Sequence, residues 1–189
     1  MNRKLRTLMA SLLAGSMLIA SVQAVTFSDV DADADYAEAA EYLNEIGVMQ
    51  GDSAGCFNPN KNVTRAQMAA LICRMLGETE NLSTDGTRFS DVAESYWANK
   101  YIIKAASLKI IGGYQDDTFK PDNTVTYEQA LAMVVRAMGE MDEADTAGGY
   151  PDGILKVAEQ NGYTNQLSAK KGDVLARWQV AMILYNVVV

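Results

Sequence analysis

Two arginines occupy positions at which the start of a helix could hold an anion. Arg65 follows Thr64, and Gln67 comes three residues after that threonine, which is the pattern of a capping box. The first turn of a helix has free backbone N–H groups and a positive dipole end, and a guanidinium can bind a carboxylate bidentately. Arg177 stands in the same place near the end of the sequence. The pattern predicts anion binding by both arginines; the alternative is that they pair with acidic neighbours.

Residues suited to catalysis or to a cofactor are scarce. The chain has no histidine, which removes the commonest general base and metal ligand. Its 24 carboxylates would place some pairs at glycosidase-like separations by chance alone. Neither a glycine-rich phosphate loop nor a strand–turn–helix nucleophile elbow is present in the sequence. We therefore expect a protein that is not an enzyme and that needs no cofactor.

A calcium site is the one metal site that the spacing suggests. Alternating aspartates occur near the N-terminal end, namely Asp29, Asp31, Asp33 and Asp35. An EF-hand loop that starts at Asp29 would need glycine at position 34 and a bidentate glutamate at position 40, and both positions hold alanine. The sequence favours a solvated acidic turn, and no metal ligand is assigned.

These residues belong to a repeated unit. Three motifs recur at an offset of 62 residues: Phe27-Ser28-Asp29-Val30 with Phe89-Ser90-Asp91-Val92, Phe57-Asn58-Pro59 with Phe119-Lys120-Pro121, and Thr64-Arg65-Ala66-Gln67 with Thr126-Tyr127-Glu128-Gln129. Repeated units bury their apolar faces against their neighbours, and they usually bind along the surfaces that they share. The repetition favours a binding function over an enzyme with one pocket.

Each unit reads as helix, loop, helix. The predicted apolar faces of the first helices are Tyr36, Ala39, Ala40, Leu43 and Ile46, and Ala98, Tyr101, Ile102, Ala105 and Leu108. Those of the second helices are Met68, Leu71, Ile72 and Met75, and Ala130, Met133, Val134 and Ala137. The spacing is that of one helix face, and Gly77 and Gly139 stand where a left-handed residue ends a helix. Phe57 and Phe119 are expected to anchor the loops to the core.

A third unit is predicted in a degenerate form. Its second-helix face would be Val180, Ile183, Leu184 and Val187, which follow the face of the second unit by 50 residues. Its first helix would run over residues 154–161, with Tyr150 and Trp178 as core residues, and Ala176 removes the capping hydroxyl. We therefore divide the chain into a first unit (residues 25–77), a linker (78–88), a second unit (89–139) and a third unit (140–189), in which 140–149 is a polar linker.

The first 24 residues have the layout of a signal peptide. Basic Arg3, Lys4 and Arg6 precede an apolar stretch, and Val22-Gln23-Ala24 offers a cleavage site. Cleavage would remove three basic and no acidic side chains, so the net charge of −8 would fall to −11. Such an acidic protein repels nucleic acid, and nothing after residue 24 reads as a membrane span. We expect an exported protein.

Two cysteines leave the question of a disulfide open. Export permits a bridge between Cys56 and Cys73. Their repeat equivalents, Thr118 in a loop and Val135 on a helix, indicate unrelated environments. A bridge is therefore not expected, and Cys73 reads as a small buried apolar residue.

The ordered motifs resemble the S-layer homology (SLH) domain. The resemblance rests on Phe-Ser-Asp-Val, on Tyr96-Trp97-Ala98, on the loop Gly113-Tyr114-Gln115-Asp116-Asp117-Thr118-Phe119-Lys120-Pro121 and on Thr-Arg-Ala-Gln. It covers residues 27–139 well and 148–189 loosely. It implies an all-α fold of three tandem repeats packed with pseudo-threefold symmetry. It also implies non-covalent attachment of an exported protein to the bacterial cell wall, through a secondary wall polysaccharide that often carries ketal-linked pyruvate.

The resemblance also implies a site in the grooves between repeats. A pyruvylated sugar needs a cation, hydrogen-bonding side chains and an aromatic platform; the candidates are Arg65, Arg177, Trp97, Tyr114, Asp29 and Asp91. For the two aspartates, the alternative is that they cap the loop that enters the first helix. In the second unit Tyr127 replaces the arginine and Glu128 adds a negative charge, so we expect fewer than three equivalent sites.

Two function classes remain open from the sequence. The first is a module that binds a wall polysaccharide, either a secondary polymer or peptidoglycan, and that anchors to or coats the cell surface. The second is a structural protein of the envelope whose degenerate grooves bind a protein partner such as an S-layer subunit. The missing arginine at Tyr127 favours the second class, whereas Arg65 and the intact loop of residues 113–121 favour the first.

Overall fold

The chain folds as helices connected by long loops. A computed structural model describes residues 27–86 and 89–189, and the predicted signal peptide lies outside them. The described helices are α2 (Ala37–Glu45), α3 (Arg65–Met75), α4 (Asn99–Ser107), α5 (Tyr127–Met138), α6 (Met141–Thr146), α7 (Asp152–Gln160) and α8 (Arg177–Val188). Strand pairing in this part of the chain is limited to three isolated bridges. The predicted all-α class is confirmed.

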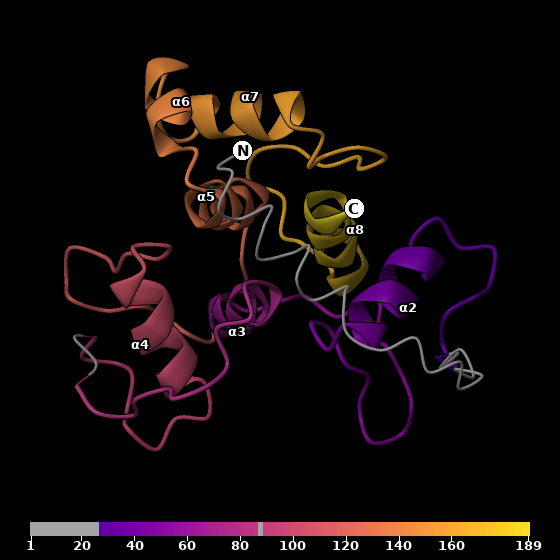
Figure 1. The fold of residues 1–189 in the computed structure, drawn as a ribbon, viewed down its shortest axis with the longest axis horizontal. Helices are drawn as coiled ribbons and strands as arrows, with labels where there is room; N and C mark the ends of the chain where they lie inside the picture. The colour runs from indigo at the N-terminus through magenta and orange to yellow at the C-terminus, as the bar shows by residue number, and fades with distance from the viewer. Residues whose placement is uncertain (1–26, 87–88) are drawn as a thin grey trace.

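Helices pair across units rather than within them. The α4 helix packs on α3, α7 packs on α5, and α2 packs on α8, so each first helix lies on the second helix of another unit. Figure 1 shows α3, α5 and α8 nearly end-on around the middle of the molecule, with α2, α4 and α7 on the outside. Each unit therefore completes its apolar core only with its neighbours, as expected for a repeat protein.

A closed ring of backbone hydrogen bonds joins the segments that precede the three inner helices. The Val63 N–H donates to the Leu175 carbonyl at 3.1 Å, the Leu175 N–H to Val125 at 3.2 Å, and the Val125 N–H to Val63 at 2.9 Å. All three side chains are buried. Pseudo-threefold packing stays a prediction, and this ring of equivalent positions supports it.

The predicted apolar faces are buried or partly buried, and only two of their residues, both at helix ends, are exposed. Met68, Leu71 and Ile72 are buried, as are their equivalents on α5 and α8. Ile46 and Leu108 are 39% and 40% exposed, so their assignment to the core was wrong. The chain leaves the helix at these residues because the next position adopts a left-handed φ, +75° at Gly47 and +60° at Lys109. The residues after each turn, Val48, Met49, Ile110 and Ile111, fill the core instead.

Most of the polar linker predicted at residues 140–149 forms the α6 helix. The short α6 helix carries acidic residues in its first turn and buries Ala144 completely. It packs on α7, where a side chain on Gly153 would collide with the Ala144 carbonyl. One buried alanine among polar residues gives no helical periodicity, and the sequence pattern therefore missed it.

Capping is complete on α3 and incomplete on α8. On α3 the Gln67 N–H donates to Thr64 Oγ1 at 3.2 Å, and the Thr64 N–H donates to Gln67 Oε1 at 3.0 Å. On α8 the Ala176 N–H donates to Gln179 Oε1 at 2.9 Å, but alanine has no hydroxyl to complete the box. The Ala176 backbone has φ −75° and ψ 161°, close to the −84° and 163° of Thr64, so it is already arranged for a cap.

Ala176→Thr is expected to stabilise the protein by about 1 kcal/mol, because it restores the hydroxyl acceptor for an amide of the first turn. At this chain size the gain corresponds to a rise in melting temperature of roughly 2–4 °C. Thermal unfolding followed by circular dichroism measures it, with Ala176→Val as a control that adds similar bulk without an acceptor. A threonine variant no more stable than the valine variant would contradict the capping argument.

Both cysteines are free thiols. Cys73 is fully buried, and its Sγ lies 3.6 Å from the Tyr101 carbonyl oxygen. Burial raises the pKa of Cys73 to about 11, so its thiol stays protonated at neutral pH. Cys56 is partly exposed, and its Sγ lies 3.4 Å from the Ser28 hydroxyl.

Candidate functional site

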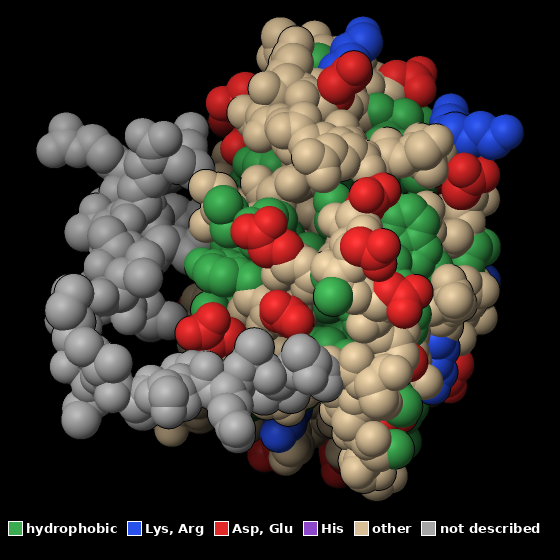
Figure 2. Space-filling view, turned by 90° about the vertical axis from the view of Figure 1, so that its right-hand side faces the viewer, with side chains coloured by type: hydrophobic (Ala, Val, Ile, Leu, Met, Phe, Trp, Pro, Cys, Tyr) green, Lys and Arg blue, Asp and Glu red, His purple; other side chains and the backbone are tan. Residues whose placement is uncertain are grey.

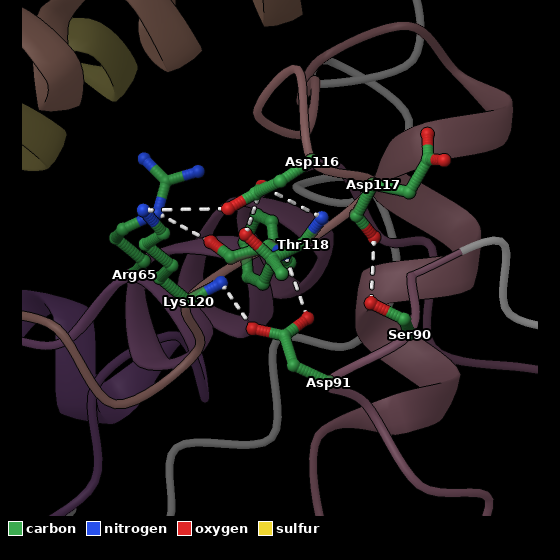
Figure 3. Close-up of polar contacts among 8 residues, drawn as sticks. Arg65, Ser90, Asp91, Asp116, Asp117, Thr118 and Lys120 are labelled. Atoms are coloured by element: carbon green, nitrogen blue, oxygen red, sulfur yellow. Dashed lines mark hydrogen bonds and ion pairs between the residues drawn. The ribbon is translucent and has the colours of Figure 1, made fainter.

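Asp29 and Asp91 fasten the long loops of their own units. Asp91 accepts from the N–H groups of Phe119 and Lys120, both at 2.7 Å, and Figure 3 shows these contacts. Asp29 accepts from Phe57 and Asn58 at 2.6 and 2.7 Å. The loop that each aspartate caps is therefore the long loop after the first helix, and not the loop that enters that helix. Each carboxylate oxygen of Asp29 and Asp91 already accepts a backbone hydrogen bond. Contact of these two aspartates with a ligand stays a prediction.

The loops are anchored by aromatic rings. Phe57 and Phe119 are fully buried, as predicted. Their ring centroids lie 5.2 Å from that of Phe27 and 5.3 Å from that of Phe89, respectively. A side chain on Gly113 would collide with the Phe89 ring, which explains the glycine at the start of the loop. The loop is thus held rigidly against the core.

Arg65 lies on the loop of the second unit. Its Nε donates to the Phe119 carbonyl at 2.8 Å, and its Cζ lies 4.6 Å from the centroid of the Phe119 ring. The Tyr114 ring is 5.1 Å away on the same guanidinium. The side chain is only 9% exposed, and this burial lowers its pKa, although a guanidinium remains protonated. Within the described part of the chain, its terminal nitrogens donate no hydrogen bond.

The backbone amides at the start of α3 are not free. The N–H groups of Arg65 and Ala66 donate to the carbonyls of Asn123 and Pro121 at 2.9 and 3.0 Å, and Thr64 accepts from the third. The same is true of α8, whose first two amides donate to Lys61 and Pro59. The expectation that free amides help to hold an anion was therefore wrong, because neighbouring units use these donors to join. An anion must be bound by side chains.

A cavity of about 430 Å³ lies beside Arg65. Tyr114 and Lys109 of the second unit line it, together with Arg136 at the end of α5 and Tyr150 of the third unit. Tyr150 is 52% exposed, so its assignment as a core residue was wrong. No acidic side chain is among the described residues that line the cavity.

The remaining residues of this cavity were missed by the sequence analysis. Lys109 and Arg136 lie outside the motifs that carried the resemblance, and their positions gave no signal by themselves. They line the cavity because α3 packs beside α5, which brings Arg65 at the start of α3 near residues of the second unit. The cavity and the surface on the side of α2 differ in charge. No described residue that lines the cavity is acidic, whereas Figure 2 shows many acidic and few basic side chains on the α2 side.

Arg177 repeats the arrangement of Arg65 at a second junction between units, where the third unit meets the first. Its Cζ lies 4.9 Å from the Phe57 ring centroid, and its Nη2 donates to the Gln50 carbonyl at 2.6 Å. Burial lowers its pKa as well. The adjacent cavity is smaller, about 160 Å³, and its lining includes Asp52. This junction therefore has a cation but less room and a nearby carboxylate.

The third junction has no arginine. Tyr127 takes that position and is buried, and its N–H donates to the Asp173 carbonyl at 2.8 Å. Glu128 accepts from the Gly172 N–H at 2.8 Å. The expectation of fewer than three equivalent sites stays a prediction, and this junction supports it.

Trp97 is separate from both cavities. It is 52% exposed, and its ring lies 5.9 Å from that of Tyr96. Tyr96 donates its hydroxyl to Asp122 at 2.6 Å. The structure therefore brings together Arg65 and Tyr114 of the predicted ligand residues, places Arg177 at a second junction and leaves Trp97 on the surface.

The described residues were also searched for a metal site and for a membrane-spanning helix. No group of three potential metal ligands occurs among these residues. None of the described helices has the length and apolar character needed to cross a membrane. The arrangement consists of partly buried cations and aromatic rings, which suits the binding of an anionic ligand.

Comparison with known proteins identifies two segments. Residues 26–69 and 88–131 match the family model of the S-layer homology domain. The chain is 28% identical over 184 residues to the middle cell wall protein of Brevibacillus brevis and 32% identical over 177 residues to a cell surface protein of Thermoanaerobacter kivui, in both cases over 92% of this chain. It is 31% identical over 117 residues, 60% of its length, to a cellulosome-anchoring protein of Acetivibrio thermocellus. It spans 17%, 23% and 26% of those three relatives.

Proposed function

We propose that this chain, two segments of which match the S-layer homology domain, attaches non-covalently to the bacterial cell wall by binding an acidic wall polysaccharide. The names of the similar proteins place them at the cell wall and cell surface, and we extend that location to this chain. We assign the binding to the cavity between the first and second units, and we interpret residues 140–189 as a degenerate third repeat that completes its wall. The role is binding without catalysis.

The cavity beside Arg65 is the observation that carries this proposal. The guanidinium of Arg65 is held in place by Phe119, while its terminal nitrogens remain available for a carboxylate. Tyr114 and Tyr150 give apolar faces with polar tips, which suit a sugar ring. A preformed concave site with a few fixed polar groups is the usual form of a small-ligand site. A sugar with ketal-linked pyruvate supplies both the carboxylate and the ring.

The acidic net charge of the chain does not prevent this binding. The Debye length is about 8 Å at physiological salt, so distant carboxylates are largely screened, whereas a direct arginine contact is not. The repulsion between protein and polymer is expected to slow association at low salt.

Co-sedimentation with purified cell walls tests the proposal. Walls are used before and after chemical removal of their secondary polysaccharide, and a third sample lacks only the ketal pyruvate. We expect pelleting with intact walls and loss of pelleting with both treated samples. Pelleting that survives removal of the polysaccharide would indicate peptidoglycan as the ligand. No pelleting of folded protein with any sample would refute wall binding and favour a protein partner.

A further inference from the structure

Glu140 is a buried carboxylate at the corner between α5 and α6. The residue is only 6% exposed. The Tyr163 hydroxyl donates to its Oε1 at 2.8 Å, whereas its Oε2 is buried and accepts no hydrogen bond from the described residues. No lysine or arginine among these residues forms an ion pair with it. Buried carboxylates are normally paired or fully hydrogen-bonded, so this exception requires an explanation.

The backbone holds Glu140 in this corner. The α5 helix ends at Gly139, whose φ is +75°, and the Glu140 N–H then donates to the Val135 carbonyl at 3.0 Å. The Glu140 carbonyl accepts from the Ala144 N–H of α6 at 3.1 Å. The residue is therefore fixed on both sides by its backbone, and its carboxylate stays directed at Tyr163.

Tyr163 comes to this contact from the end of α7. Its N–H donates to the Ala158 carbonyl at 2.9 Å, and its own carbonyl accepts from Asn186 Nδ2 of α8 at 3.3 Å. Burial raises the pKa of Tyr163, and its hydrogen bond to Glu140 adds to the shift, so the hydroxyl remains a donor. The contact joins the corner of α5 and α6 to α7 and α8, and Figure 1 shows α6 and α7 together beside α5.

The protonation state of Glu140 affects this packing. Burial raises the pKa of Glu140; the hydrogen bond from Tyr163 and the nearby side chain of Asn161 oppose the shift, and the negative charge of Glu143 adds to it. Tyr163, after α7, and Glu143, on α6, are the titratable groups that act on Glu140 from the described residues. A buried neutral carboxyl group costs less than a buried charge that lacks a cation, so protonation favours the closed packing.

We propose that Glu140 and Tyr163 form a pH-sensitive latch that holds α6 and α7 against α5. The latch is closed most tightly when the Glu140 carboxyl group is protonated, and it weakens when that group ionises. Tyr150 lies between α6 and α7 and lines the cavity beside Arg65, so the latch also holds one wall of that cavity. It is a property of the fold and does not depend on what the cavity binds.

The pH range of the effect follows from the direction of the shift. In the unfolded chain the carboxyl group titrates at the ordinary value for glutamate, about 4.3. Below that pH the group is protonated in both states, and the latch has its full stability. As the pH rises from there through the higher pKa of the folded state, the latch loses stability, because the unfolded state gives up its proton first. Each unit of difference between the two pKa values corresponds to about a tenfold change in the opening equilibrium.

Two measurements on the full chain test the latch. Nuclear magnetic resonance of the carboxyl carbon of Glu140, from about pH 3.5 to pH 8, gives its pKa in the folded state, which we expect above the ordinary value. Deuterium exchange of the Tyr163 amide, corrected for the intrinsic rate at each pH, gives the opening equilibrium. Opening is expected to increase over this range by the factor that the measured pKa dictates.

Matched variants isolate the contribution of Glu140. Glu140→Gln removes the titration, so its excess opening over pH should vanish, to within about threefold. Glu143→Gln removes a neighbouring charge on α6 and should keep the pH dependence. The loop-fastening Asp29 and Asp91 titrate in every variant, so their effect cancels in the comparison. Tyr163→Phe should raise the pKa of Glu140 further, because it removes a hydrogen bond that favours the ionised form.

Either of two results would overturn the latch. The first is a folded-state pKa of Glu140 at or below the ordinary value for glutamate. The second is a pH dependence of opening that is the same in Glu140→Gln as in the unaltered chain. If Glu140→Gln does not fold, the carboxyl titration of the unaltered chain and of Tyr163→Phe still decides the question.

Discussion

Replacing Arg65 by alanine is expected to weaken binding to cell walls by about 10- to 100-fold. A hydrogen-bonded contact between a guanidinium and a carboxylate contributes roughly 1.5–3 kcal/mol, and each 1.4 kcal/mol corresponds to a factor of ten in affinity. The terminal nitrogens of Arg65 are free of hydrogen bonds to the described residues, so its contribution to ligand binding is available in full. Titration of intact walls with the variant, by co-sedimentation, gives the change in affinity.

The same substitution also affects the fold, and this effect must be separated from binding. Arg65 donates to the buried Phe119 carbonyl, and the loss of that bond leaves an unsatisfied acceptor at a cost of about 1–3 kcal/mol. The capping box of Thr64 and Gln67 does not involve the arginine side chain, so α3 itself should keep its helicity. Urea unfolding of the variant gives the folded fraction under the binding conditions. If binding falls only in proportion to that fraction, Arg65 has a structural role and not a ligand role.

Arg177→Ala is the matched control for this experiment. It removes the equivalent guanidinium at the second junction, which has a similar contact with the Phe57 ring. Its cavity is smaller and contains Asp52, so a weaker contribution to polymer binding is expected. Equal losses in the two variants would show that both junctions bind the polymer with similar strength.

The repeated motifs predicted the local structure well. Thr64 and Gln67 form the expected capping box, and the apolar residues at helical spacing on α3 and α5 are buried, apart from the partly buried Ala137. Both features depend on residues within one or two turns of each other, for which sequence spacing is a direct guide. The missing hydroxyl at Ala176 was also evident from the alignment of the repeats.

The contacts between units could not be predicted in the same way. The amides at the start of α3 are used by Asn123 and Pro121, more than 50 positions later in the sequence, and nothing in the local pattern indicates this. Arg136 reaches the cavity because α5 packs beside α3, which is a property of the assembled units. The position of Tyr150 also depends on the assembled units, because Tyr150 belongs to the third unit and lines a cavity between the first and the second. The candidate site was therefore predictable only in the part contributed by Arg65 and Tyr114.

Phe119→Ala is expected to destabilise the protein by about 3–5 kcal/mol. The ring is fully buried between Phe89 and the guanidinium of Arg65, so its removal leaves a cavity in the core and takes away the support of that arginine. The loss is a large part of the 5–15 kcal/mol that typically stabilises a domain. Urea denaturation followed by circular dichroism measures it. A cost below about 1 kcal/mol would show that the loop is not anchored through this ring.

Phe57→Ala separates the stability of the fold from the position of the site. Phe57 is equally buried and packs on Phe27 as Phe119 packs on Phe89, so its replacement should cause a similar loss of stability. It supports Arg177 and not Arg65, however, so wall binding by the folded fraction should be largely retained. In Phe119→Ala, binding by the folded fraction should fall, because Arg65 and Tyr114 lose the rigid loop against which they are placed. If the two variants lose binding equally, the cavity between the first and second units is not the main site.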